Sequence, residues 1–263
     1  MCELLGMSAN VPTDICFSFT GLMQRGGRTG PHRDGWGIAF YDGNACRVFH
    51  DPAASADSEL ARLVHRYPIK SRTVLSHIRR ATHGRVCLEN THPFVRELWG
   101  RMWSFAHNGK LPGVKRLPLG FYRPVGTTDS EHAFCWMLHQ IRTVFPRPPA
   151  RVAPLARLIA ALSDELRALG TFNLLLSDAR HLFVYCTTHL CHITRRAPFG
   201  EARLEDAEVV VDFARETTEN DVVTVVATRP LTTNEAWTPL STGALEVFSN
   251  GLPVWRRGPE ANV

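Results

Sequence analysis

Short β-strand patterns that follow one another along the chain, with the helical patterns grouped between them, constrain the fold more than any other feature. Strands joined by short turns pair antiparallel, whereas a parallel sheet needs a crossover, usually a helix, between its strands. The last two strand patterns flank Asn250-Gly251, a dipeptide that strongly favours a two-residue hairpin turn. The sequence therefore predicts an α+β fold with largely antiparallel sheets and argues against a doubly wound parallel sheet.

Apolar residues at helical spacing predict helices after Asp14, over residues 57–67, after Thr128 and over residues 155–169. Thr128 and Glu131 form a capping-box pattern at the start of the third helix. Strand patterns are predicted at residues 2–7, 36–41, 46–50, 73–79, 102–106, 172–177, 182–186, 208–213, 222–228, 245–249 and 253–256. The helices lie between runs of strands and do not alternate with them.

The length of 263 residues allows one large domain or two small ones. The proline-rich stretch 146–149 is too short for a linker between domains, and the chain shows no internal repeat or low-complexity segment. We therefore expect one domain over residues 2–263.

Composition limits the partners of the protein. The net charge of +5, with a pI near 9.0, favours anionic small molecules only weakly and lacks the clustered basic residues of a nucleic-acid interface. No apolar run approaches the ~18 residues of a membrane helix, and no signal peptide is visible. Seven cysteines, an odd number in a chain of this length, indicate a reducing compartment. We expect a cytoplasmic globular protein that binds neither nucleic acid nor membrane.

The common motifs for nucleotide hydrolysis, hydride transfer, serine hydrolysis and zinc proteolysis are absent from the sequence. One cluster, Cys186-x-x-His189-x-Cys191-His192, has residue types that bind metals. It lacks a second ligand pair some distance away, and its intervening residues suit the end of a strand. We interpret it as structural packing and expect no metal site.

Cys2 is the cysteine with the clearest chemical potential. If Met1 is removed, Cys2 carries a free α-amine with a reference pKa of about 7.7–8.0. That amine is a general base within reach of its own thiol, so the nucleophile is activated without a histidine. A small second residue is common, however, so this pair needs support from elsewhere in the chain.

Three further segments provide that support. Arg79 follows a predicted strand, and its planar guanidinium suits bidentate capture of a carboxylate. Asn108 and Gly109 follow another strand and offer an amide side chain and an approachable backbone N–H, the parts of an oxyanion hole. Asp129 lies at a predicted helix start, where it could bind an α-ammonium group. Together these residues describe a site for a free amino acid with a scissile side-chain carbonyl.

Each segment also has an ordinary structural interpretation. Arg79 could be a surface arginine, Asn108-Gly109 a plain turn and Asp129 a helix cap. Taken one at a time, the structural interpretation is favoured, so the functional hypothesis depends on the combination with Cys2.

The chain resembles the class-II (N-terminal nucleophile) glutamine amidotransferases, most closely their stand-alone YafJ-like branch. The resemblance is carried by the opening residues 1–10, by His32-Arg-Asp-Gly-Trp-Gly37 and by Thr194-Arg-Arg-Ala-Pro-Phe-Gly200, and it extends to about residue 253. It implies a four-layer αββα sandwich of the Ntn-hydrolase type, with the nucleophile on the first strand.

The resemblance also implies a reaction and a site. Cys2 would attack the side-chain amide of glutamine, release ammonia and leave a γ-glutamyl thioester that water hydrolyses. Asn108 and Gly109 would form the oxyanion hole. Arg79, helped by Thr82, would hold the substrate α-carboxylate and Asp129 the α-amine, without a metal or organic cofactor. Met1 would be removed on maturation.

Arg80 departs from the family pattern, since many members have an aromatic residue after the carboxylate-binding arginine. Multidomain relatives carry a second domain that uses the ammonia, so an acceptor here would lie on a separate protein. Two alternatives remain open: a hydrolase of another γ-glutamyl amide, which would use the same residues, and a catalytically idle binding module on the same fold.

Overall fold

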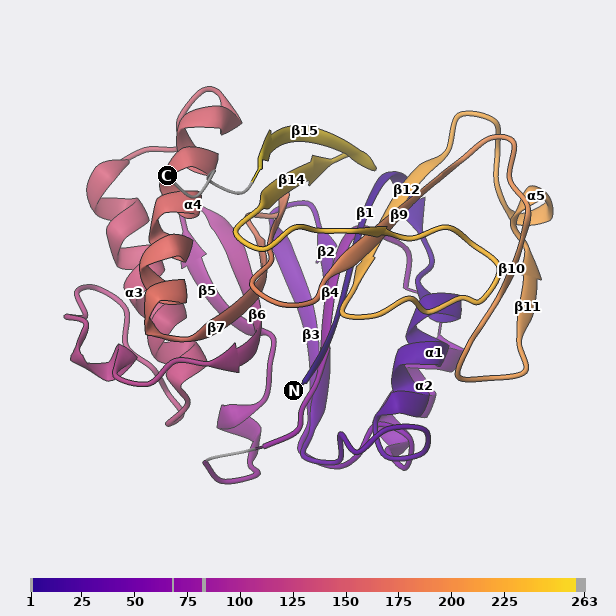
Figure 1. The fold of residues 1–263 in the computed structure, drawn as a ribbon, viewed down its shortest axis with the longest axis horizontal. Helices are drawn as coiled ribbons and strands as arrows, with labels where there is room; N and C mark the ends of the chain where they lie inside the picture. Colours follow the sequence, from indigo (N-terminus) through magenta and orange to yellow (C-terminus); the bar gives the residue numbers. More distant parts are fainter. Residues whose placement is uncertain (1, 68, 82–83, 259–263) are drawn as a thin grey trace.

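The strands form two larger sheets that lie against each other (Figure 1). The computed structural model describes residues 2–67, 69–81 and 84–258. Sheet 1 has the order β13 (Thr238–Pro239), β9 (Cys191–Arg196), β12 (Val222–Ala227), β1 (Glu3–Thr13), β4 (Ser71–Ile78), β2 (Trp36–Asp42) and β3 (Ala45–Asp51). Sheet 2 has the order β15 (Leu252–Arg257), β14 (Leu245–Ser249), β8 (Leu182–Tyr185), β7 (Thr171–Ser177), β6 (Arg101–Lys110) and β5 (Phe94–Leu98).

A separate ribbon pairs β10 (Glu201–Arg203) with β11 (Val210–Asp212). All strand pairs formed by the described residues are antiparallel, which confirms the prediction of mainly antiparallel sheets.

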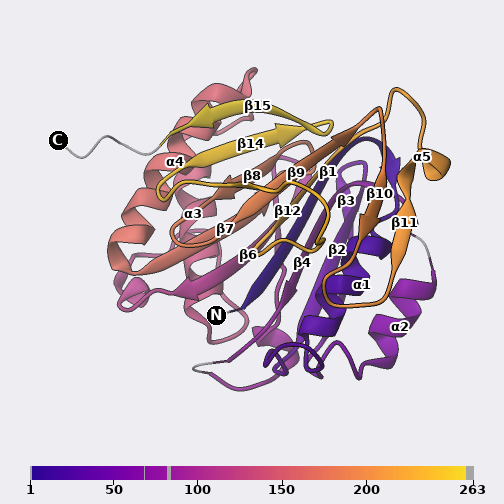
Figure 2. The same ribbon diagram turned by 45° about the vertical axis from the view of Figure 1, so that its right-hand side comes forward.

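Helices cover the outer faces of the two sheets (Figures 1 and 2). Helices α1 (Cys16–Arg25) and α2 (Glu59–Arg66) lie on sheet 1, and α3 (Asp129–Val144) and α4 (Val152–Leu169) lie on sheet 2. The shorter helices are α5 (Phe213–Glu216), η1 (Leu88–Asn90) and η2 (Val114–Arg116). The layers are therefore helix, sheet, sheet and helix, and the implied αββα sandwich is confirmed.

Apolar side chains fill each of the three interfaces between these layers. One cluster joins α1 and α2 to sheet 1, a second joins α3 and α4 to sheet 2, and a third lies between the sheets. Strand β1 shows how period-two alternation supplies two of them. Its Leu4 is buried between the sheets, whereas the next residue, Leu5, is buried against the helices of sheet 1. Because both faces of each sheet are covered, the central strands are apolar on both sides.

The start of α3 differs in detail from the predicted capping box. The hydroxyl of Thr128 accepts a hydrogen bond from Glu131 N at 3.1 Å, which is the first half of the expected capping box. The Glu131 carboxylate does not return to Thr128; it accepts from the backbone N–H groups of Val125 and Gly126 and pairs with Arg96. Tertiary partners thus replace the local reciprocal bond.

The predicted strand boundaries were wrong at several places. Strand β1 continues to Thr13 rather than ending at Met7, and β11 is confined to Val210–Asp212. Strands β5 and β9 were not predicted, because each carries charged residues that weaken its alternation (Arg96 and Glu97; Arg195 and Arg196). Pairing with β6 and β12 supplies the order that the local pattern lacks.

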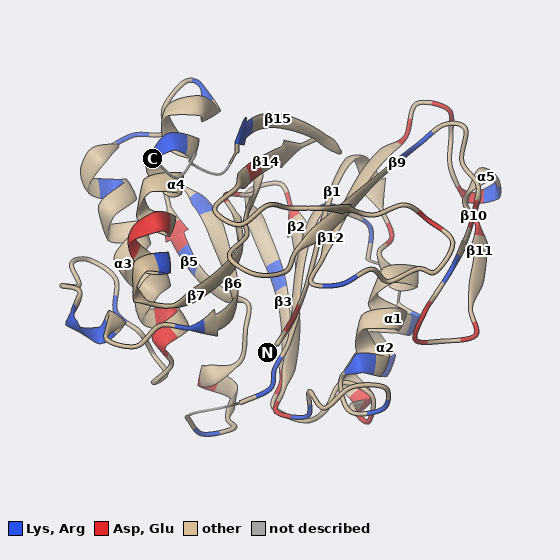
Figure 3. Cartoon of the chain, in the orientation of Figure 1, with Lys and Arg blue, Asp and Glu red and all other residues tan. Residues whose placement is uncertain are grey.

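Charged residues are distributed over both helical layers, the loops and the strand ends (Figure 3). Within the described part of the chain, no helix is both long and apolar enough to cross a membrane.

Candidate active site

The apolar layer between the sheets becomes polar at one end. Three inter-sheet residues, Leu4, Leu75 and Ala106, lie on β1, β4 and β6. Cys2 lies two residues before Leu4, and His77 and Asn108 lie two residues after Leu75 and Ala106. A spacing of two along a strand keeps each of them on the same face. Asn108 and His77 are fully buried, and Cys2 is partly buried. Alternation turns these polar groups toward the layer between the sheets, and the packing of the two sheets brings them together at this end, which we call the Cys2 end.

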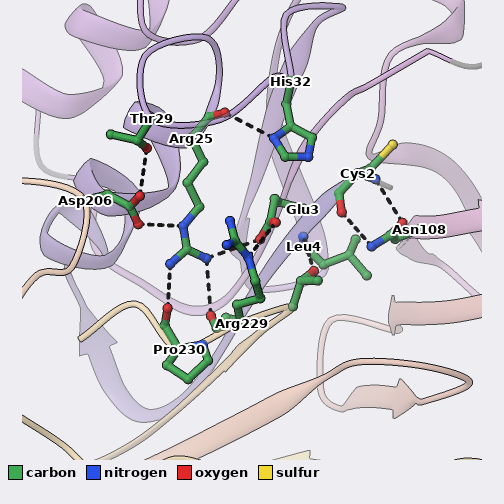
Figure 4. Close-up of polar contacts among 12 residues, drawn as sticks. Cys2, Glu3, Leu4, Arg25, Thr29, His32, Asn108, Asp206, Arg229 and Pro230 are labelled. Atoms are coloured by element: carbon green, nitrogen blue, oxygen red, sulfur yellow. Dashed lines mark hydrogen bonds and ion pairs between the residues drawn. The ribbon is translucent and has the colours of Figure 1, made fainter. Parts of the chain in front are cut away.

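Cys2 and Asn108 form two reciprocal hydrogen bonds across the gap between the sheets (Figure 4). The backbone N–H of Cys2 donates to Oδ1 of Asn108 at 3.0 Å, and Nδ2 of Asn108 donates to the carbonyl oxygen of Cys2 at 2.6 Å. An amide side chain carries two N–H donors, so one remains available beside Cys2. The structure thus joins two of the candidate residues that lie 106 positions apart in the chain.

The Cys2 thiol is held by the loop that follows β4. The backbone N–H of Arg80 lies 3.4 Å from Sγ of Cys2. The loop itself is fixed by Asp34, whose carboxylate accepts from Ala81 N at 2.7 Å and whose N–H donates to the carbonyl of Arg79. Burial raises the pKa of the Cys2 thiol, and the Arg80 backbone and the nearby positive charges offset this only in part. The protonated thiol is therefore favoured at neutral pH, and a nucleophilic role needs a base.

Arg79 reaches this end because of the register of β1 with β4. Glu3 lies opposite Ile78 in the sheet, so the next residues on the two strands are Cys2 and Arg79. Arg79 is buried, with 4% of its surface exposed, and Nη1 donates to the carbonyl oxygen of Arg85 at 3.1 Å. It is not the surface arginine of the structural alternative, because burying a guanidinium is costly without such partners.

Asn90 connects the Arg79 loop to the start of α3. Its Nδ2 donates to the same Arg85 carbonyl at 3.1 Å, and its Oδ1 accepts from Thr127 N at 2.8 Å. Asn90 is 1% exposed. A buried amide that satisfies backbone groups on both sides fixes the separation of the two segments.

Asp129 begins α3, as the sequence predicted. Its Oδ2 accepts from Leu111 N at 2.8 Å, and its Oδ1 accepts from Ser130 N at 2.9 Å. The bond to Leu111 ties the helix start to the segment that follows β6, the strand that carries Asn108. Asp129 therefore does more than cap its own helix.

His107 links the same helix to β6. Its Nε2 lies 3.0 Å from the carbonyl oxygen of Thr171, and its Nδ1 lies 2.8 Å from the hydroxyl of Ser130. Because a carbonyl only accepts, Nε2 carries the proton and Nδ1 accepts from Ser130. Burial lowers the pKa of His107, so the ring is neutral and works as a fixed spacer between Asn108 and Asp129.

Gly109 is required by a close backbone approach. A Cβ atom at this position would lie 1.9 Å from the carbonyl oxygen of Thr171 and 2.7 Å from Nε2 of His107. Only glycine fits this strand position without displacing β7.

A buried arginine network fixes the start of β1 from the other side (Figure 4). Arg25, at the end of α1, is 1% exposed and lies 3.2 Å from the carboxylate of Glu3, the neighbour of Cys2. It also pairs with Asp206 at 2.6 Å and donates to the carbonyl of Pro230. Arg229 approaches the second oxygen of Glu3 at 3.1 Å. The residue after Cys2 is thus held by two guanidinium groups.

The structure brings Cys2, Asn108, Arg79 and Asp129 into one connected framework with Gly109. Thr82, the remaining residue of the predicted site, lies outside the described residues. Arg80, Asp34 and Asn90 were not assigned to the site from sequence. Asp34 did lie in the His32–Gly37 segment that the sequence analysis noted, whereas Arg80 acts through its backbone, which no side-chain pattern reveals.

Comparison with known proteins gives consistent results. A sequence profile of the class-II glutamine amidotransferases matches residues 1–262. The YafJ protein of Escherichia coli (strain K12) is 61% identical over 251 residues, which cover 95% of this chain and 98% of YafJ.

Solved structures agree with this. A crystal structure of a predicted glutamine amidotransferase from Pseudomonas aeruginosa PA01 superposes with a TM-score of 0.79 at 55% identity, covering 97% of this chain and all of that one. The glutamine phosphoribosylpyrophosphate amidotransferase of B. subtilis superposes with a TM-score of 0.60 at 15% identity and shares the fold. The superposition covers all of this chain and 50% of that one.

Proposed function

The chain belongs to the class-II glutamine amidotransferases, and we propose that it hydrolyses the side-chain amide of glutamine with Cys2 as the nucleophile. The reciprocal hydrogen bonds between Cys2 and Asn108 carry this proposal. They hold Cys2 against the amide of Asn108 on the other sheet, where the oxyanion would form. The contact joins the residue before β1, in sheet 1, to β6 of sheet 2.

The raised pKa of the Cys2 thiol defines what the mechanism must supply. Removal of Met1 would free the α-amine of Cys2, which Oδ1 of Asn108 already contacts at its nitrogen. The neutral amine would take the thiol proton, and Sγ would form a bond to the amide carbon of glutamine. The carbonyl π electrons would move to oxygen, giving a tetrahedral oxyanion.

Asn108 and Gly109 would stabilise that oxyanion through the second Nδ2 proton and a backbone N–H. The ammonium of Cys2 would then protonate the leaving nitrogen, and the C–N bond would break to release ammonia. Water, deprotonated by the same amine, would cleave the γ-glutamyl thioester to glutamate and restore the thiol.

The remaining residues would select the substrate. Arg79 would bind the α-carboxylate through its guanidinium, and Thr82 would assist it. The lone pairs of Asp129 that its two backbone donors leave open would bind the α-ammonium. The framework through Asn90 and His107 keeps these groups at a fixed separation, which suits a free amino acid.

We extend the proposal to the rest of the chain. Residues 2–263 form one catalytic domain that works in the cytoplasm. Neither a metal nor an organic cofactor takes part in the steps above.

The test measures ammonia and glutamate released from L-glutamine by protein whose intact mass shows that Met1 has been removed. We expect activity in the wild type and none in Cys2→Ala, with Cys46→Ala, a partly exposed cysteine on β3, as a matched control that stays active. A diazoketone analogue of glutamine should add to Cys2 and be visible by mass spectrometry.

A panel of other γ-glutamyl amides separates the alternatives. Turnover of one of them without turnover of glutamine would replace glutamine as the substrate. If processed protein forms no thioester with any member of the panel and does not react with the diazoketone, the enzyme proposal is wrong.

A further inference from the structure

We propose that a basic cavity at the opposite end of the inter-sheet layer binds a small phosphorylated metabolite, of the sugar-phosphate type. The cavity has a volume of about 680 Å³. It is lined by the β2–β3 turn at residues 41–44, the β7–β8 turn at 178–181, residues 249–250 and residues 148–152 before and at the start of α4. The proposal does not depend on the reaction at Cys2.

The cavity is remote from the Cys2 end. Pro12, near the far end of β1, contributes to its lining, and Cys2 immediately precedes the near end. The lining residue of β1 nearest to Cys2 is Ala9, and the seven residue steps between them span about 23 Å at 3.3 Å per residue. A ligand there would not touch a substrate held at Cys2, so the cavity is a second site and not an extension of the first.

Basic side chains dominate the charge of the cavity. Five of its lining residues are basic and two are acidic; the basic ones are Lys70, Arg72, Arg101, Arg151 and Arg180, and the acidic ones are Asp42 and Asp178. They come from one strand of each sheet, from loops beside the strands and from the N-cap of α4, so tertiary packing gathers charges that the sequence keeps apart. Clustered charge of one sign in a concave surface raises the local concentration of the opposite ion.

Asp178 does not neutralise this charge, because it is already used inside the protein. It is 1% exposed, lies 3.3 Å from Arg101 and accepts hydrogen bonds from the backbone N–H groups of Arg180 and His181. The side chain of His181, 3.1 Å away, and these backbone N–H groups keep the pKa of Asp178 low despite its burial. Asp178 thereby fixes the turn that presents Arg180.

The other four basic residues are available for a ligand. Lys70, Arg72, Arg151 and Arg180 are exposed, and none of them forms an ion pair within the described ranges of the chain. The exposed carboxylate of Asp42 is the one remaining acidic group of the lining. Basic side chains that lie close together without carboxylate partners repel one another unless an anion or counter-ions accompany them.

The start of α4 adds uncompensated partial charge to the same wall. Its N-cap residue, Arg151, makes no side-chain cap hydrogen bond, and its first turn contains no acidic residue. Val152 and Leu155 of this turn line the cavity. A helix start without a cap leaves backbone N–H donors and the positive end of the helix dipole free for an anion.

The ligand class follows from the charge, the size and the polarity of the lining. A phosphate monoester carries close to two negative charges and several acceptor oxygens, which suits several arginines better than a single carboxylate does. A volume of about 680 Å³ is in the range of small-molecule sites. The exposed amides of Asn44 and Asn250 line the cavity and suit the hydroxyl groups of a sugar.

Isothermal titration calorimetry with ribose 5-phosphate tests the proposal on the full chain, with ribose as the uncharged control. We expect saturable binding of ribose 5-phosphate that weakens as the salt concentration rises, and no binding of ribose. The double variant Arg72→Ala/Arg180→Ala should lose roughly tenfold or more in affinity, because charge-assisted hydrogen bonds are removed. Arg157→Ala removes an exposed charge from α4 outside the cavity and should bind as the wild type does.

Thermal unfolding of each variant verifies that the fold is intact, which is expected for exposed side chains. The proposal is overturned if ribose 5-phosphate shows no saturable binding to the wild type. It is also overturned if the double variant binds with unchanged affinity, or if ribose binds as well as its phosphate ester does.

Discussion

The two polar ends of the inter-sheet layer are built in opposite ways. At the Cys2 end the polar groups are mostly buried, and hydrogen bonds join Cys2 to Asn108 and Arg79 to the Arg85 carbonyl. At the basic cavity, Lys70, Arg72, Arg151 and Arg180 are exposed and, among the described residues, form no ion pair. One end fixes each group by geometry, whereas the other concentrates charge without fixing it.

This difference shows what each end is suited to do. Bond making requires reacting atoms held within a fraction of an ångström, which buried and satisfied hydrogen bonds provide. Capture of a multiply charged ligand tolerates flexible arms, because Coulomb attraction falls off slowly with distance. Substitutions at the Cys2 end should therefore affect rates and stability, whereas those at the cavity should affect binding alone.

The largest effect is expected for Asn108. Asn108→Ala and Asn108→Asp both lose the Nδ2 donor, and kcat for glutamine hydrolysis should fall roughly 10²–10³-fold. The variant Arg72→Ala/Arg180→Ala at the other end should keep the wild-type rate. Steady-state ammonia release measures all three. A near wild-type kcat in Asn108→Asp would remove the oxyanion role from this residue and break the comparison.

The second-largest effect on catalysis is expected for Arg79. Arg79→Ala removes charge-assisted hydrogen bonds to the substrate carboxylate, worth about 1.5–3 kcal/mol, so kcat/KM should fall roughly 10–100-fold, mainly through KM. Arg79→Lys keeps the charge but not the planar fork and should recover only part of the loss. The exposed Arg66→Ala is the control. An unchanged KM in Arg79→Ala would place the carboxylate elsewhere.

Substitution of Gly109 tests whether close packing at the Cys2 end contributes to the stability of the fold. In Gly109→Ala the new Cβ would meet the Thr171 backbone oxygen, so the free energy of unfolding should fall by roughly 1–3 kcal/mol. Gly200→Ala is the control, since its Cβ meets nothing within 4 Å. Urea unfolding followed by fluorescence measures both. Equal midpoints for the two variants would contradict the close packing described at the Cys2 end.

The smallest effect concerns pH. Burial lowers the pKa of His77 to about 3 in the folded protein, against about 6.5 in the unfolded chain. Between these values the unfolded chain binds a proton that the folded one does not. The free energy of unfolding should therefore fall with pH below about 6.5, by about 1.4 kcal/mol per pH unit for this residue.

Urea unfolding at about pH 7.5 and 5.5 measures this slope. His77→Phe preserves the ring packing on His92, where the ring centroids are 4.2 Å apart, and should give a shallower dependence. The exposed His189→Ala should leave the slope unchanged. A wild-type slope in His77→Phe would show that burial of this ring does not govern acid stability.

Much of the fold followed from local patterns, because those patterns report burial directly. The hydrophobic spacing of α3 and α4 and the succession of short strand patterns were sufficient to predict helices and antiparallel sheets. Strands β5 and β9 escaped prediction, since their order comes from the neighbouring strand and not from their own residues.

The candidate site was predicted in part for a similar reason. Cys2, Arg79, Asn108, Gly109 and Asp129 have side chains or backbones whose chemistry is distinctive, and the resemblance to a family placed them together. The supporting contacts of Asp34, Asn90 and Arg25 depend on segments that meet only in three dimensions.

The sequence by itself determined the fold class, the periodic faces of the strands and the presence of a cysteine beside Met1. Periodicity and residue chemistry are local, so they can be read from the order of the residues. Only the tertiary structure decided that Cys2 meets Asn108, and that five basic residues from strands, loops and the N-cap of α4 line one cavity. Both depend on strand register and on how the two sheets pack, which are set by long-range contacts that no segment contains alone.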